Sequence, residues 1–316
     1  MIDNKDNKKA IILILIGMTV FALQDTFIKL LSDDTNIYLI YFSRCIIGLI
    51  IIFTYLKIKK IPIVISTHYP LLTILRSIAF FFGFSLYYYS LTKLSLAMAV
   101  TLFFVSPFFI TILSMLIIKE QIGWRRWIAI LVGFIGVYLV MNPKLNDFNI
   151  YSLFPVICAI CYAFTVIIQK KTSDKDSLFS QVIHIYISAI IFSILIKSSL
   201  GVFDFQPEII EKYKFLLIEW NISSYINLLM LVGIGVTGVT GFFCLFGAYN
   251  IGSPSTIAPF EYVIILWAIL ISWFLWGETL NLKAYIGLFF IVSAGLYTFI
   301  RELNLNKQIS IDKPLR

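Results

Sequence analysis

Charged residues are scarce in this sequence: they make up 13% of its 316 residues, whereas about a quarter is usual in a soluble globular domain. Hydrophobic residues make up 60% of the chain, and the mean hydropathy is +0.93. A soluble core of this size could not bury so many apolar side chains. The composition therefore excludes a soluble domain and predicts a protein embedded in the lipid bilayer.

Residues that commonly carry catalysis or bind metals are also rare. The chain has two histidines, His68 and His184, and four cysteines that all lie in apolar runs. Cys158 and Cys161 form one C-x-x-C, which lacks the second pair that a zinc site needs, so we expect no metal and no cofactor. The motifs H-E-x-x-H and G-x-S-x-G and paired intramembrane aspartates are absent, so we expect no enzyme. A membrane-embedded enzyme and a channel or sensor subunit are the alternatives.

Ten apolar runs are long enough to predict transmembrane helices, since about 20 helical residues cross roughly 30 Å of hydrocarbon. We therefore expect an all-α integral membrane protein with ten transmembrane helices. The predicted spans are Ala10–Leu31, Ile37–Leu56, Leu71–Leu91, Ser95–Ile118, Trp127–Met141, Ile150–Ile168, Leu178–Ile196, Ser223–Ala248, Pro254–Trp276 and Ala284–Ile300.

Cations between the spans predict the orientation. With the amino terminus inside, sixteen of the 25 lysines and arginines fall on inner segments and six on outer ones. This asymmetry follows the positive-inside rule and places both termini in the cytoplasm, with the loop 201–222 outside. It also explains the net charge of +8 without a nucleic-acid partner. We expect a multi-pass protein of the cell inner (plasma) membrane.

The two halves of the chain resemble each other. Phe21-Ala22 and Lys29 match Tyr162-Ala163 and Lys170 at an offset of 141 residues, and the segment from Ser95 to Glu120 matches that from Ser253 to Glu278 at an offset of 158. We therefore predict one repeat over residues 1–149, a second over 150–303, and a polar cytoplasmic tail over 304–316. Because each repeat has five spans, the second enters the membrane inverted, which is typical of secondary transporters that work by alternating access.

Several segments, in this order along both halves, resemble the EamA family of the drug/metabolite transporter superfamily. They are Leu91–Ala97, Ser106–Phe108, Lys119–Trp127, Val132–Val137, Ala258–Tyr262, Trp267 and Gly277–Leu280. The resemblance implies a ten-helix carrier with a central cavity between the halves. The segments Phe42–Arg44 and Trp124–Trp127 make the chain similar to a subgroup described as S-adenosylmethionine or riboflavin carriers. A nucleoside-like or vitamin-like substrate is what this similarity implies.

Ionisable side chains within the predicted spans fall at two depths. Asp25, Lys29 and Arg44 form a predicted outer network, and Arg76, His184 and Glu261 form a predicted inner one. All of these residues except Lys29 lie about 8–10 Å from a helix end. The two networks could form and break in turn as the halves rock, and a proton on Glu261 could couple to that movement. The alternatives are lysine and arginine side chains that snorkel to the headgroups, static ion pairs, and an uncoupled facilitator.

Aromatic rings and prolines in the spans around the expected cavity complete the prediction. Rings suit flat or cationic ligands, although helix packing is the alternative for most of them. We expect a small zwitterionic or aromatic metabolite, which is amino-acid-like, nucleoside-like or vitamin-like, carried by a monomer or a dimer. The predicted substrate-binding or gating residues are Gln24, Asp25, Arg44, Tyr88, Phe103, Phe104, Pro107, Tyr162, His184, Phe246, Pro259, Glu261 and Tyr262.

Overall fold

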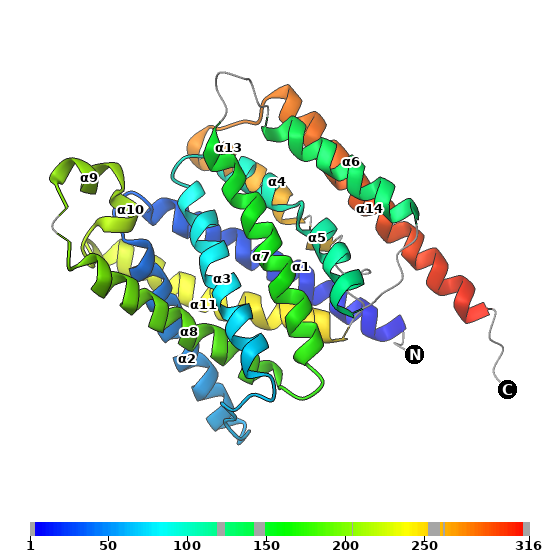
Figure 1. Cartoon of the computed structure of the whole chain (residues 1–316), viewed down its shortest axis with the longest axis horizontal. Coiled ribbons are helices and arrows are strands. Elements are labelled where there is room, and N and C mark those ends of the chain that lie inside the picture. The colour runs from blue at the N-terminus through cyan, green and yellow to red at the C-terminus, as the bar shows by residue number, and fades with distance from the viewer. Residues whose placement is uncertain are drawn as a thin grey trace.

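The computed structural model describes residues 4–118, 124–141, 149–203, 205–251, 260–261 and 263–311, and every regular element in these ranges is helical (Figure 1). The α-helices are α1 (Asn4–Leu31), α2 (Ile37–Ile58), α3 (Pro70–Ser90), α4 (Leu96–Phe103), α5 (Ser106–Leu113), α6 (Trp124–Met141), α7 (Leu153–Thr172), α8 (Leu178–Leu200), α9 (Pro207–Lys212), α10 (Lys214–Leu217), α11 (Tyr225–Ile251), α13 (Val263–Trp276) and α14 (Leu282–Ile311).

Seven segments of the described chain are long and apolar enough to cross a membrane. They correspond to predicted spans one to four and six to eight. The fifth, ninth and tenth predicted spans contain shorter apolar helical stretches, Leu131–Val140, Val263–Trp276 and Leu282–Ala294. An all-helical, multi-pass membrane protein is therefore confirmed.

Short polar segments end one helix and cap the next. Asn36 caps α2 by accepting a hydrogen bond from the Tyr38 N–H, and Ser95 and Ser177 cap α4 and α8 in the same way. Each cap satisfies a backbone donor at a helix start that has no partner within the helix. These caps make tight turns between spans possible.

The fourth predicted span is broken in its middle. α4 ends at Phe103, α5 begins at Ser106, and a π-helical turn, Ser114–Ile118, follows. Pro107 lies in the first turn of α5, where the missing N–H of proline costs no helical hydrogen bond. The break divides this span into two short helices, α4 and α5.

Helices from the two halves of the sequence pack against each other. α1 packs on α11, α3 on α7, α2 on α8, and α6 on α14. α6 and α14 lie side by side along one edge of the bundle, and α1 begins on the same side as α14 ends (Figure 1). We call this side the proximal end, and the side where α1 ends the distal end.

Glycines let the backbones of α6 and α14 approach closely. A Cβ atom added at Gly136 would lie 2.6 Å from the Gly287 carbonyl oxygen, and one added at Gly287 would lie 2.5 Å from the Gly136 carbonyl oxygen. Such contacts between small residues are a common basis of helix association in membranes, where lipid removes the hydrophobic driving force between helices.

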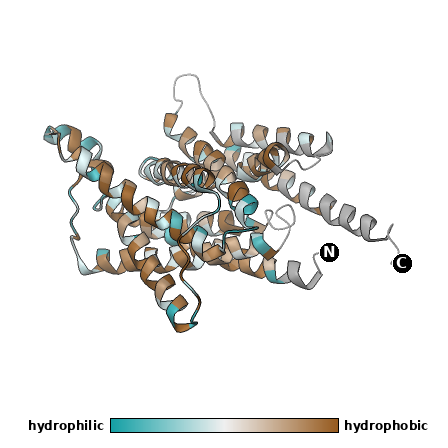
Figure 2. Cartoon of the chain, turned by 60° about the horizontal axis from the view of Figure 1, so that its bottom comes forward, coloured by the Kyte–Doolittle hydropathy of each residue, from teal (hydrophilic) through white to brown (hydrophobic). Residues whose placement is uncertain are grey.

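Large apolar side chains cover the outside of the bundle, including Leu116, Leu131, Trp273 and Phe274. Hydrophobic residues predominate along the helices, and hydrophilic ones gather at several helix ends (Figure 2). An exposed apolar surface of this extent matches lipid rather than water.

Asp176 ties the α7–α8 connection to the α2–α3 connection at the proximal end. Its carboxylate accepts hydrogen bonds from the Thr67 hydroxyl and from the His68 N–H at 3.0 Å, and it lies 3.2 Å from the His68 ring nitrogen Nδ1. Burial alone would raise the pKa of Asp176, but these hydrogen bonds and the attraction of the His68 ring hold it below its ordinary value. The contact joins the two halves of the chain.

Asp176→Asn should destabilise the protein by about 1.5–3 kcal/mol at pH 7, because an amide nitrogen cannot accept the hydrogen bonds that the carboxylate accepts. Since the folded pKa is depressed, the contribution of Asp176 is complete above the unfolded pKa of about 3.9 and is lost as pH falls through the folded value. Melting temperatures of the purified parent and variant between pH 7 and pH 3 measure this difference, which should shrink only at the acid end. Asp174→Asn is the control, because exposed Asp174 accepts only from the Tyr69 hydroxyl among the described contacts.

Candidate functional site

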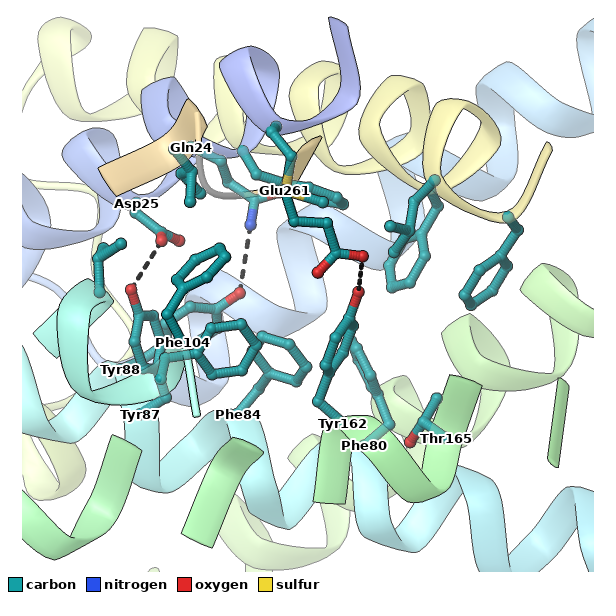
Figure 3. A pocket seen from close by; sticks show the side chains of 18 of the residues that line it. Gln24, Asp25, Phe80, Phe84, Tyr87, Tyr88, Phe104, Tyr162, Thr165 and Glu261 are labelled. Carbon is teal, nitrogen blue, oxygen red and sulfur yellow. Dashed lines mark hydrogen bonds between the residues drawn. The ribbon is translucent and has the colours of Figure 1, made fainter. Parts of the chain in front are cut away.

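A cavity lies at the centre of the bundle. Helices of both halves contribute to it, and rings and a few polar side chains project into it (Figure 3). We call it the chamber. Its lining residues are Met18, Phe21, Gln24, Asp25, Arg44, Phe80, Phe84, Tyr87, Tyr88, Val100, Phe103, Phe104, Tyr162, Thr165, Phe242, Leu245, Phe246, Glu261 and Ile264.

Asp25 and Arg44 form one polar group of the chamber through two neighbouring tyrosines. The Tyr87 hydroxyl donates to Asp25 Oδ2 at 2.9 Å, and Arg44 Nη1 donates to the Tyr88 hydroxyl at 2.8 Å. Gln24 Nε2 also donates to the Tyr88 hydroxyl, at 3.2 Å. Asp25 and Arg44 are thus linked through Tyr87 and Tyr88, and neither residue is in the described ion pairs.

Gly238 on α11 makes room for this group. A Cβ atom there would lie 2.7 Å from Arg44 Nε and 3.1 Å from Gln24 Oε1. Both of these atoms are buried and have no hydrogen-bond partner. A buried donor and a buried acceptor left without partners are costly, and the close approach of α11 at Gly238 is where both of them lie.

Glu261 forms the second polar group, supplied by the other half of the chain. Its Oε1 accepts a hydrogen bond from the Tyr162 hydroxyl at 3.1 Å (Figure 3). The Tyr249 hydroxyl donates to the same oxygen, while the buried Oε2 has no partner among the described residues. Tyr162 comes from α7 and Tyr249 from α11. The carboxyl group is therefore held by one oxygen and presents the other.

Aromatic rings line the chamber between the two polar groups. Phe84 lies 5.9 Å from Tyr88 and 6.3 Å from Tyr162 between ring centroids, and Phe103 lies 5.2 Å from Tyr162. Phe80 and Phe242 lie under the Arg44 guanidinium, at 5.9 Å and 5.3 Å. Such walls suit a ligand with a flat ring system or a positive charge.

Lys29 closes the distal end above the chamber. Its Nζ lies 3.0 Å from Glu278 Oε2, donates to the Leu94 carbonyl oxygen at 3.4 Å, and lies 4.6 Å from the centroid of the Trp276 ring. At the proximal end, Lys170 Nζ donates to the Tyr249 carbonyl oxygen at 3.2 Å, and Gln169 Nε2 donates to Asn250 Oδ1 at 2.9 Å.

Nine of the predicted substrate-binding or gating residues line the chamber: Gln24, Asp25, Arg44, Tyr88, Phe103, Phe104, Tyr162, Phe246 and Glu261. Pro107 and His184 are not among its lining residues. Pro107 lies in the first turn of α5, and His184 Nε2 contacts the Ile65 carbonyl oxygen. Pro259 and Tyr262 lie outside the described residues.

The two predicted charge networks have different partners in the structure. Lys29 bonds Glu278 rather than Asp25. In the predicted inner network, Arg76 Nη2 donates to the Gln181 carbonyl oxygen at 3.2 Å, His184 contacts Ile65, and Glu261 bonds tyrosines. Residues at one depth in a bundle meet only if their helices also turn the right faces to each other.

Several chamber residues are missing from the predicted set, among them Phe80, Phe84, Tyr87, Thr165 and Phe242. Phe80, Phe84 and Tyr87 lie on one face of α3 at spacings of four and three residues, together with Tyr88. This helical spacing is the signal that could have identified them.

A bundle of membrane-length helices around a chamber with buried ionisable groups defines a membrane transport protein. The chain belongs to the EamA-like transporter family, whose family model matches residues 8–142 and again 149–300.

Relatives with described activities are transporters. The chain is 26% identical over 295 residues to an S-adenosylmethionine uptake transporter of Rickettsia prowazekii (strain Madrid E), which covers 91% of each chain. It is 26% identical over 246 residues to a riboflavin transporter of Vibrio cholerae, which covers 77% of this chain and 75% of that one. A crystal structure with 14% identity superposes with a TM-score of 0.66 over 94% of this chain and 99% of the other. That likeness shows the fold alone.

Proposed function

We propose that the protein carries a small organic metabolite with a flat ring across the cell inner membrane by alternating access. The observation that carries this proposal is the central chamber, in which ring walls connect two polar groups with unpartnered buried atoms. Ligand pockets of this kind are mostly apolar, with a few polar groups that fix the orientation of the ligand. The substrate is amino-acid-like, nucleoside-like or vitamin-like.

The names of the relatives support the substrate class. S-adenosylmethionine and riboflavin, which the two transporters above are named for, both carry a flat heterocycle. Phe84, Phe103 and Tyr162 pack against one another with centroids 5.2–6.3 Å apart, and such a ring would stack on the side of this cluster that faces the chamber. The amide and charged groups at Gln24, Arg44 and Glu261 would fix its polar substituents.

Ten membrane-crossing segments in two inverted repeats, 1–149 and 150–303, followed by a tail over 304–316, form the scaffold in this proposal. The double match of the family model supports it. The helix contacts support it too. In the two repeats α1 is equivalent to α7 and α3 to α11, and α1 packs on α11 just as α7 packs on α3. Equivalent turns also repeat a bond: the Ser32 hydroxyl donates to the Lys29 carbonyl oxygen and the Ser173 hydroxyl to that of Lys170.

The cation asymmetry of the sequence supports cytoplasmic termini, which makes the proximal end cytoplasmic and the distal end external. Counterflow of radiolabelled S-adenosylmethionine and riboflavin into proteoliposomes tests the function. A saturable flux supports a carrier, a flux that does not saturate would indicate a channel, and a chemically altered solute would indicate an enzyme. An imposed pH gradient separates a proton-coupled carrier from a facilitator.

Lys29→Gln should open the external side of the chamber, because it removes the ion pair with Glu278. The loss of about 1–2 kcal/mol from the closed state corresponds to a roughly fivefold to thirtyfold shift in population. A cysteine at chamber residue Val100, in a variant without the native cysteines, should react that much faster with an impermeant maleimide added outside.

Lys93→Gln is the matched control, since Lys93 is an exposed cation on the α3–α4 connection, next to the Leu94 carbonyl that Lys29 contacts. The maleimide should label the cysteine at position 100 at the same rate in the Lys93→Gln variant as in the parent. Equal rates for Lys29→Gln and the parent would show that the ion pair with Glu278 does not hold the external end closed.

A further inference from the structure

The ionisable groups of the chamber are unequal in sign. Asp25 and Glu261 are carboxyl groups, whereas Arg44 is the one cationic side chain among the described lining residues. All three are buried. An ionised group in a low-dielectric site needs a partner of opposite charge or hydrogen bonds to stabilise it.

Arg44 is committed to the Asp25 side of the chamber. It donates to Tyr88, next to the Tyr87 that donates to Asp25, and it lies over the ring of Phe242. The close fit at Gly238 leaves little space for the side chain to move towards α11. Arg44 therefore lies with the Asp25 group rather than with Glu261.

Among the described residues no cation pairs with Glu261. The two described ion pairs include none of Asp25, Arg44 and Glu261, but only Asp25 shares its hydrogen-bonded group with Arg44. Two tyrosine hydroxyls converge on Oε1, and Oε2 is buried without any hydrogen-bond partner. The tyrosines fix the direction of the carboxyl group, so the free oxygen has a defined position at the chamber wall (Figure 3).

The surroundings of Glu261 favour a cation over a neutral donor. Tyr162 packs at 5.2 Å from Phe103 and at 6.3 Å from Phe84, so several ring faces lie beside the carboxyl group. Aromatic faces attract positive charge, including ammonium and other onium groups that are too crowded to donate hydrogen bonds. A carboxylate set among rings is a common way to bind such a group.

We propose that Glu261 is the residue that selects the charge of the substrate: Oε2 receives the positive centre of an onium metabolite, an ammonium or sulfonium group, while Arg44 and Gln24 take its anionic or polar end. The inference rests on the proposed function, because it assigns a specificity to the same chamber. It predicts that a cationic solute binds better than a neutral solute of the same shape.

S-adenosylmethionine and S-adenosylhomocysteine form a suitable probe pair, because they differ by one methyl group and the positive charge that it places on sulfur. Their dissociation constants, measured by calorimetry on the purified full-length protein, should differ by about tenfold or more in favour of the sulfonium compound. Glu261→Gln keeps the size of the side chain and should reduce the ratio to near one. Glu261→Asp, which keeps the charge, should restore part of it. Glu208→Gln, an equivalent change at an exposed residue of α9, should leave the parent ratio.

Equal affinities of the parent for both probes, or a ratio unchanged by Glu261→Gln, would overturn the charge-selecting role. So would transport of neutral riboflavin driven by a pH gradient and abolished by Glu261→Gln, since Glu261 would then bind a proton. If the folded parent bound neither adenosyl probe, the assignment to an onium metabolite would be wrong. Saturable counterflow of another solute in these cases would leave the proposed transport function standing.

Discussion

Arg44→Met should abolish substrate binding and lower the free energy of unfolding by roughly 3 kcal/mol. The substitution removes the one cationic side chain among the described chamber residues, and a buried carboxyl group without a compensating charge is costly. It also removes the hydrogen bond to Tyr88 and the cation over Phe242. Thermal unfolding of the purified protein and calorimetric titration with S-adenosylmethionine measure the two effects.

The double variant Asp25→Asn, Arg44→Met separates charge from packing. Because it removes both charges, it should recover most of the lost melting temperature while binding stays absent. If the double variant is less stable than Arg44→Met alone, the two residues do not compensate each other, and the account of this polar group is wrong.

Gly136→Ala should lower the melting temperature by several degrees. The added methyl group would lie 2.6 Å from the Gly287 carbonyl oxygen and 2.8 Å from the Ile291 side chain, so α6 and α14 would have to separate. Overpacking of a tight contact costs about 1–3 kcal/mol. The damage would fall on the helix pair at the edge of the bundle and should leave the affinity for bound solute close to that of the parent.

Gly247→Ala on α11 provides the comparison. Its added methyl group would meet only the Leu13 Cδ1 atom, at 3.7 Å, which is an ordinary contact. This variant should melt at or slightly above the parent temperature, because alanine favours a helix more than glycine does. Equal losses in the two variants would attribute the effect to glycine chemistry in general rather than to the approach of α6 and α14.

The level of a residue along its helix could be counted from the sequence. A helix rises 1.5 Å per residue, and this count assigned Asp25 and Arg44 to one level and Glu261 to another, whereas the structure brings all three to the chamber. The family resemblance and the aromatic residues identified most of the other predicted lining residues.

The direction in which each side chain points could not be predicted. A soluble helix reveals its buried face by its hydrophobic periodicity, but here the lipid side and the core side are both apolar. Lys29 illustrates the result: it lies one turn from Asp25 on the same face of α1, yet its long side chain reaches the distal end and bonds Glu278. The repeat relation between Glu120 and Glu278 drew attention to the second residue without indicating its partner.

The unequal charge of the two halves gives the chamber a polarity. At the offsets of the repeat, Asp25, Arg44 and Glu261 correspond to Val166, Ile185 and Phe103, so none of the three groups has an ionisable counterpart at the equivalent position of the other half. A symmetric pocket would accept an elongated solute in either of two opposite poses. This chamber distinguishes the two ends of a solute. A solute with unlike ends would therefore keep a single pose throughout its passage. The polar group that the gates uncover would decide which end of the solute leaves first.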